Sequence, residues 1–422
     1  MFLEKIVLHN IRCFAHLEID FFNEKNEIKN KTIILGNNGT GKSTILKSIA
    51  LVTSGSNAIG ELLGKPNDWI KKGAKKASIA ATLRTADNRI RKIDITFEEG
   101  DSFTMMISRN QKSLLAIDKA IEKSKRNYFT IGYGVNRRTG NSFFRRRSSN
   151  FDTDRAENVA TLFSADAYLF PLDSWIFQMD YYQGEVGLHT IKKALNKLLP
   201  GVSFLRPDKG AKSILFETKD GVINFNELSD GYKVTANWFS DLLYRIMETF
   251  QDYQNALNAR FLLLIDEIGL HLHPSWQRTI METITTLFPN AQIICTTHSP
   301  FVAQQANSGE LYTVMRNESS GLELFNYKSD PSRLLIHQII MSNIFGLDTD
   351  ESVYVENLKN DYKNKNLSEK VTKRGIQSFD ELESKLSEIP MQLDRTQNLF
   401  DDDYLSLMNE LKSELKRNRG ND

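Results

Sequence analysis

The octapeptide GNNGTGKS at Gly36–Ser43 constrains this chain more than any other stretch. It follows the apolar run Ile33–Leu35, and apolar residues recur with helical spacing over 45–51 just after it. Strand, glycine-rich loop and helix in this order form a P-loop, in which main-chain N–H groups and a helix N-terminus surround a phosphate. The sequence therefore predicts an α/β fold of the P-loop NTPase type, a mixed sheet with flanking helices.

Within this loop, residue types at fixed positions predict separate roles. Lys42 is expected to reach the β- and γ-phosphates, and the Ser43 hydroxyl to bind Mg²⁺. We accordingly expect ATP and Mg²⁺ as cofactors. The other loop residues predicted to contact the nucleotide are Gly36, Asn37, Asn38, Gly39, Thr40, Gly41 and Thr44.

The segment FLLLIDE supplies a second part of the predicted site. Phe261–Ile265 is apolar throughout, as a strand buried on both faces is, and Asp266 stands at its carboxyl end, where open α/β sheets bind ligands. Asp266 is expected to hold Mg²⁺ through water, and Glu267 to act as general base toward the attacking water. An Asp-Glu pair after a strand also serves as a helix cap, but the P-loop favours the metal and base roles.

Two further strand ends carry polar candidates. His298 follows the buried-type strand AQIICTT and is predicted to contact the γ-phosphate and the attacking water; the alternative is a histidine bonded to local loop carbonyls. Asn136, Arg137 and Arg138 follow the apolar stretch 128–135 and are candidates to approach the same site.

Composition sets the broad class. The chain has 422 residues, 40% hydrophobic and 25% charged, with a net charge of +1, which indicates a soluble globular protein of two or three units. Its cysteines, Cys13 and Cys295, lack metal spacing and are expected to be buried thiols in a reducing compartment. The sequence shows no secretion signal and no apolar run near the ~18 residues of a membrane span, so we expect a cytoplasmic protein without membrane contact.

The heptapeptide ELSDGYK resembles the signature of ABC ATPases, with Asp230 in place of the first glycine and Tyr232 in place of glutamine. Its place in the chain, before FLLLIDE and the histidine strand, agrees with that resemblance. In ABC ATPases two heads pack head-to-tail. The resemblance implies that Ser229 and Gly231 close over the γ-phosphate held by Lys42 of a second copy, in a homodimer or higher oligomer.

Three further segments resemble the SMC, RecF and OLD branch of these ATPases. NIRCF (Asn10–Phe14) resembles their opening motif, which implies that Arg12 lies by the phosphates. GLHLHP (269–274) resembles their D-loop region, and TTHSP their histidine motif. A glutamine at the expected Q-loop position is missing, and Gln178, on a predicted helix, is a poor substitute.

The middle of the chain resembles the ATPases of anti-phage systems, Septu-type (PtuA-like) and retron-associated. The resemblance rests on GYG-x-x-R near 132, on LF-x-x-x-A-x-L and on the following SW. It implies an ATPase that regulates a protein effector, an HNH or Toprim nuclease. The expected division is an ABC ATPase head at 1–52 and 225–330, a globular α+β insertion at 53–224, and a helical C-terminal region at 331–422 that docks a partner.

Two other functions stay open. A RecF- or SMC-like DNA repair ATPase is one, although the sequence has no heptad run for a coiled-coil arm. An OLD-like ATPase with its own nuclease is the other; Asp348 and Asp350 could bind magnesium there, although such carboxylates, and those of 401–403, are more often solvated. The basic patches at 71–76 and Arg145–Arg147 are candidates for DNA contact, or else solvated charged surface.

Overall fold

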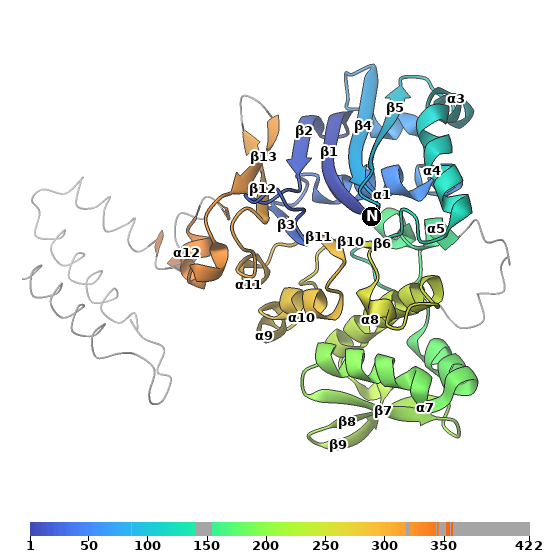
Figure 1. Cartoon of the computed structure of the whole chain (residues 1–422). Helices are drawn as coiled ribbons and strands as arrows, with labels where there is room; N and C mark the ends of the chain where they lie inside the picture. Colours follow the sequence, from blue (N-terminus) through green and yellow to red (C-terminus); the bar gives the residue numbers. More distant parts are fainter. Residues whose placement is uncertain are drawn as a thin grey trace, which may run out of the picture. The chain divides into compact units, whose positions relative to one another are not determined.

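The computed structural model describes residues 1–85, 87–139, 154–317, 321–342, 344–345, 352–354 and 356–357. The chain divides into two compact units, 1–348 and 349–422, and the helices and strands labelled in Figure 1 belong to the first. Several sequence candidates lie outside the described residues: Arg145–Arg147, Asp348, Asp350, the carboxylates of 401–403 and most of the C-terminal region after 345.

A six-stranded sheet forms the centre of this unit, in the order β13-β12-β3-β11-β10-β6. Neighbouring strands from β12 to β6 are parallel, and β13 runs antiparallel to β12. The carboxyl ends of β3, β11, β10 and β6 therefore meet at one edge, and the P-loop leaves from one of them. The strands are β3 (Lys31–Gly36), β6 (Thr130–Tyr133), β10 (Leu262–Ile265), β11 (Gln292–Thr296), β12 (Leu311–Asn317) and β13 (Gly321–Tyr327).

Alternate side chains of the central strands enter two different hydrophobic cores. Ile34 of β3 belongs to the same cluster as Ile45 and Ile49 of helix α1 (Lys42–Ser54). Ile33 and Leu35 belong to the cluster on the other face. Because successive strand residues point to opposite faces, a strand covered on both sides is apolar at every position. This explains the uninterrupted apolar runs that precede the P-loop and Asp266.

The second sheet is antiparallel, in the order β2-β1-β4-β5. Its strands are β1 (Phe2–Ile11), β2 (Phe14–Asp20), β4 (Lys76–Arg84) and β5 (Ile90–Glu98). Strands β4 and β5 come from the segment 53–224, as does β6 of the central sheet. This segment therefore extends both sheets of the expected head, and also forms a small sheet of its own from β7 (Val202–Asp208), β8 (Ser213–Thr218) and β9 (Gly221–Asn224), the last of them at its end.

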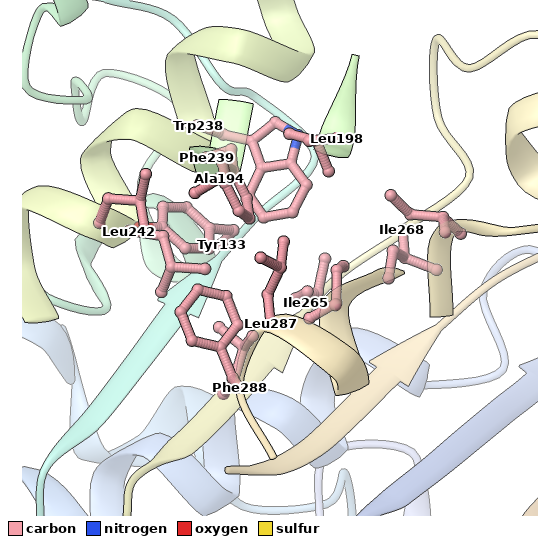
Figure 2. Packing of buried hydrophobic residues seen from close by; sticks show 14 of the residues in the cluster. Tyr133, Ala194, Leu198, Trp238, Phe239, Leu242, Ile265, Ile268, Leu287 and Phe288 are labelled. Carbon is pink, nitrogen blue, oxygen red and sulfur yellow. The ribbon is translucent and has the colours of Figure 1, made fainter. Parts of the chain in front are cut away.

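Two long helices contribute to the hydrophobic core on the face of the central sheet opposite helix α1. Helix α7 (Leu172–Leu198) is interrupted by non-helical backbone at Gly184 (φ 58°), so it consists of two helical segments joined at a kink. Helix α8 (Asp230–Thr249) begins within the ELSDGYK segment, with Ser229 as its N-cap. Figure 2 shows Trp238 and Phe239 of α8 packed near Tyr133 of β6 and Ile265 of β10.

The remaining described elements are short. The helices are α2 (Ser56–Leu62), α3 (Phe103–Arg109), α4 (Gln111–Lys123), α5 (Asp154–Glu157), α6 (Ala160–Phe163), α9 (Pro274–Gln277), α10 (Ile280–Leu287), α11 (Pro300–Ala303) and α12 (Ile336–Ile340). The 3-10 turns are Pro66–Trp69, Phe225–Glu227, Ala256–Asn258 and Pro331–Arg333. In the described part of the chain, no helix has both the length and the apolar character to cross a membrane.

Candidate nucleotide-binding and hydrolysis site

A pocket of about 930 Å³ opens at the carboxyl edge of the central sheet. Its wall is shared by the P-loop, the turn after β10 and the segment after β11. The predicted site residues among its lining are Arg12, Asn38, Gly39, Gly41, Lys42, Ser43, Thr44, Asp266, Glu267 and His298. Because β3, β10 and β11 are neighbouring parallel strands, segments more than 200 residues apart in sequence reach one pocket.

The P-loop backbone requires glycine at a defined place. Gly41 has φ 90°, in the left-handed region, and a Cβ built on it would lie 2.5 Å from Cys13 Sγ and 2.7 Å from the ring of Phe14. Phe14 is fully buried, so its ring has no room to withdraw. Gly39 is also left-handed, with φ 77°, but has no atom within 4 Å of such a Cβ.

We therefore expect Gly41→Ala to destabilise the protein more than Gly39→Ala. Both substitutions carry backbone strain in the left-handed region, and only the first adds overpacking, which costs about 1–3 kcal/mol. Thermal unfolding without nucleotide should show the lower Tm for Gly41→Ala. Equal Tm values for the two variants would contradict the close packing of the P-loop against the β1–β2 turn.

Lys42 lies at the floor of the pocket, with 7% of its side chain exposed. Its Nζ is 2.9 Å from the carbonyl oxygen of Gly36 and 3.3 Å from that of Asn37, and it donates to both. Burial lowers the pKa of Lys42, and the nearby carboxylates of Glu267 and Asp266 oppose that shift. The ammonium group thus stands where an anionic phosphate would stabilise its charge.

Asp266 joins the P-loop to the neighbouring strand. Its side chain is 5% exposed, and Ser43 Oγ donates to one carboxylate oxygen at 2.5 Å while Thr296 Oγ1 donates to the other at 2.5 Å. A hydroxyl and a carboxylate in contact are the oxygen donors that Mg²⁺ prefers, so the residues present fit that ion. Thr296 was not predicted as a site residue; its place at the end of a buried-type strand, two residues before His298, was the available signal.

Glu267 and His298 contact Lys42 within the pocket. Nε2 of His298 is 2.8 Å from Nζ of Lys42 and 3.2 Å from Oε1 of Glu267. It accepts from Lys42 in one tautomer and donates to Glu267 in the other. Oε1 of Glu267 is 3.7 Å from Nζ of Lys42, and the main-chain N–H of Glu267 donates to Thr296 Oγ1 at 2.8 Å.

The three candidate residues after β6 differ in their burial. Arg137 is buried, and its Nη2 donates to the carbonyl oxygens of Asp266 at 2.7 Å and Glu267 at 3.0 Å. Asn136 and Arg138 on either side are exposed. Of the three candidates, only Arg137 therefore contacts described residues of the site, and its side chain donates to their main-chain carbonyls. Gln178, the poor Q-loop substitute, is exposed on α7.

Arg12 and Cys13 form the β1–β2 turn at the side of the pocket. The Arg12 guanidinium lies 4.3 Å from the ring centroid of Trp69, and its buried Nε has no hydrogen-bond partner within the described structure. Cys13 is half-buried, contrary to the expectation of two buried thiols, because it faces the pocket; Cys295 is fully buried, which raises its pKa. Arg12 thus lines the same pocket as the P-loop residues, and its contact with the phosphates stays a prediction.

The ELSDGYK corner lies apart from this pocket. Ser229 is exposed at the N-terminus of α8, and neither Ser229 nor Gly231 is among the described residues that line the pocket. Gly231 packs on the turn after Glu267, where an added Cβ would lie 2.9 Å from the carbonyl oxygen of His271. Within one chain, therefore, the two candidate phosphate-binding helix ends do not meet.

Curated relatives of this chain include a Septu protein and a retron ATPase. The Septu protein PtuA of Bacillus mycoides (strain KBAB4) is 25% identical over 353 residues, which cover 82% of this chain and 45% of that protein. The chain thus spans less than half the length of this relative. The Retron Vc95 probable ATPase of Vibrio cholerae serotype O1 biovar El Tor is 25% identical, with 73% of each chain covered.

Among solved structures, the SMC head domain from Thermotoga maritima matches with 16% identity and a TM-score of 0.42, covering 77% of this chain and 99% of that one. The two curated relatives confirm the resemblance to Septu-type and retron-associated ATPases that the sequence motifs indicated. A family model matches residues 31–303, from the strand before the P-loop to the helix after His298, and the chain belongs to the family that it describes, "AAA domain, putative AbiEii toxin, Type IV TA system".

Proposed function

We propose that this chain is an ATPase that binds Mg²⁺ and ATP in the 930 Å³ pocket and hydrolyses the γ-phosphate with Glu267 as general base. The observation that carries the proposal is the convergence of three strand ends on one pocket. They supply a phosphate-binding lysine, a Ser43–Asp266 oxygen pair and a second carboxylate at its mouth. These are the parts that phosphoryl transfer to water requires.

In the proposed reaction, Lys42 binds the β- and γ-phosphates and the P-loop amides surround them. Ser43 and Asp266 would hold Mg²⁺, which supplies charge neutralisation of the phosphate oxygens when bound. Glu267 accepts a proton from a water molecule whose oxygen forms a bond to the γ-phosphorus. The bond from that phosphorus to the bridging oxygen breaks, and ADP leaves with the electron pair. His298 orients the water and the γ-phosphate.

We further propose that two copies of the chain close head-to-tail around ATP. The N-terminus of α8 is exposed and does not line the pocket of its own chain, so Ser229 and Gly231 are free to approach the γ-phosphate bound to a second copy. A helix N-terminus carries a partial positive charge and unpaired N–H donors, which favour a phosphate. ATP would then form part of the interface.

We propose that the assembled ATPase regulates an effector protein, an HNH or Toprim nuclease, in defence against phage. The names of the Septu and retron relatives support this assignment. The region 331–422 is proposed as the docking segment for that partner. Direct DNA contact through the basic segment 71–76 stays a prediction.

Two measurements test the ATPase proposal. The full chain should release phosphate from ATP in the presence of Mg²⁺, and its mass in solution should double when a non-hydrolysable ATP analogue replaces ADP. Lys42→Ala should abolish both effects, whereas Lys112→Ala, at an exposed position on α4, should change neither. Phosphate release that persists in Lys42→Ala would contradict the proposed site.

The effector proposal has its own test. Co-expression of the chain with its neighbouring genes should yield a stable complex with a nuclease of the HNH or Toprim type. A purified chain that cleaves DNA by itself would instead favour the alternative with an intrinsic nuclease.

A further inference from the structure

Arg137 holds a buried positive charge whose hydrogen bonds, among the described residues, go to main-chain carbonyls. Its side chain is 7% exposed, and within the described structure its hydrogen bonds go to the carbonyl oxygens of Gly134, Asp266 and Glu267. Burial lowers its pKa to about 10, so the guanidinium stays charged at neutral pH. A planar group with several fixed donors suits this task, because it can bond two successive carbonyls at once.

The main chain that Arg137 contacts has an unusual conformation. Glu267 has φ 49°, in the left-handed region that a residue with a side chain seldom adopts. Such a conformation persists only where its surroundings fix it, and here Arg137 holds the carbonyl while Thr296 Oγ1 holds the amide. This turn decides where the Glu267 carboxylate points, and therefore whether it faces Lys42 and His298.

The Arg137 guanidinium also contacts helix α8. It lies 5.3 Å from the ring centroid of Trp238, which is fully buried. One turn further along α8, Asp241 accepts from Tyr133 of β6 at 2.8 Å and from Arg245 at 2.7 Å. Tyr133 lies beside Trp238 (Figure 2), and their ring centroids are 5.6 Å apart. Helix α8 is thus joined to β6 and to the residues after it at two points.

We propose that Arg137 is a positioning residue that fixes the Asp266–Glu267 turn and couples it to helix α8. The inference rests on the proposed function in one respect, because the coupling matters for hydrolysis only if Glu267 is the base. Ser229 lies at the N-terminus of the same helix. A displacement of α8 on contact with a second copy would therefore reach the carboxylate of Glu267 through Trp238 and Arg137.

The first test measures the turn itself by hydrogen–deuterium exchange of the full chain. In Arg137→Ala, the amides of 266–270 should exchange about tenfold faster, because the turn loses a fixed partner, whereas those of 31–36 should not change. Arg155→Ala is the matched control. Arg155 also donates to main-chain carbonyls, those of Lys125, Asn127 and Tyr128, and its pKa is also lowered to about 10 by burial, but these carbonyls lie outside the turn.

The second test separates positioning from folding by kinetics. Arg137→Ala should lower kcat about 100-fold through misplacement of Glu267, with the Kd for ATP unchanged, and Arg137→Lys should recover part of the loss. Arg155→Ala is expected to lower Tm by a similar amount, yet should keep kcat. Unchanged exchange at 266–270 in Arg137→Ala would overturn the inference. If the wild-type chain released no phosphate, the proposed function would fail, while the exchange data would still decide the positioning role.

The link to α8 is tested by a double-mutant cycle. Trp238→Phe keeps an aromatic ring but weakens its attraction for the guanidinium, and should lower kcat a few-fold. In the Arg137→Ala background the same substitution should have no further effect. Trp175→Phe, at another fully buried tryptophan, serves as the control. An equal loss with and without Arg137 would show that Trp238 acts independently of it.

Discussion

Glu267→Gln is expected to abolish ATP hydrolysis while ATP binding is retained. The amide keeps the shape of the carboxylate and can still hold a water molecule, but it accepts no proton at neutral pH. Loss of a general base lowers a rate by about 100- to 10,000-fold. Phosphate release in the presence of Mg²⁺ measures the loss, and titration with a fluorescent ATP analogue measures binding.

The electrostatics of the pocket indicate that binding should not weaken. Oε1 of Glu267 lies 3.7 Å from Nζ of Lys42, at the mouth of a site that receives a polyanion. Removing one negative charge there lowers the repulsion toward the γ-phosphate. The variant should therefore bind ATP as tightly as the wild type or more tightly, and should accumulate in the closed dimer if closure requires ATP.

Glu282→Gln is the matched control, because Glu282 is an exposed carboxylate on α10 and does not line the pocket. It should hydrolyse ATP at the wild-type rate. Wild-type turnover in Glu267→Gln would remove Glu267 from the base role. His298 would then become the candidate, since its Nε2 is the other proton-accepting group in contact with Lys42.

The parts of the site that the sequence predicted are those encoded locally. A P-loop, an apolar strand followed by Asp266 and a strand followed by His298 each carry their own signal within about ten residues. Because β3, β11 and β10 pair in parallel as neighbours, their carboxyl ends then lie side by side at one edge of the sheet. The same holds for helix α8, which begins at Asp230 within the Ser-Asp-Gly segment, directly after its N-cap Ser229.

The parts that the sequence missed depend on contacts between distant segments. Thr296 became a partner of Asp266 only because β11 lies beside β10 in the sheet. Arg137 could not be distinguished from Arg138, because burial of one and exposure of the other is decided by the path of the chain after β6. Likewise, nothing local within 53–224 showed that β4 pairs with β1 and that β5 pairs with β4.

Ser229→Arg is expected to abolish hydrolysis in the full chain while each head still binds ATP. Ser229 is exposed and is not among the described residues that line the pocket of its own chain, so a bulky cation there leaves Lys42 and Ser43 untouched. In the proposed dimer, the same side chain would be forced against the γ-phosphate site of the second copy. Loss of phosphate release with an unchanged Kd for ATP is the expected pair of results.

Gln251→Arg controls for the added charge. Gln251 is exposed just beyond the opposite end of α8, which is about 30 Å long at 1.5 Å per residue. An arginine at this end of the helix should leave hydrolysis unchanged. A similar loss of hydrolysis in Ser229→Arg and Gln251→Arg would indicate a general effect of charge on α8 and not a specific contact of Ser229.

Mixing Ser229→Arg with Lys42→Ala distinguishes a contact in trans from one in cis. A heterodimer of the two variants contains one site with both defects and one site in which an intact Lys42 faces an intact Ser229. The mixture should therefore recover hydrolysis at up to one working site per heterodimer, whereas each variant alone forms only defective sites. If Ser229 acted on the P-loop of its own chain, no heterodimer could contain a working site. Native mass spectrometry must show the heterodimer. If that mixture then released no phosphate, the head-to-tail arrangement would be refuted.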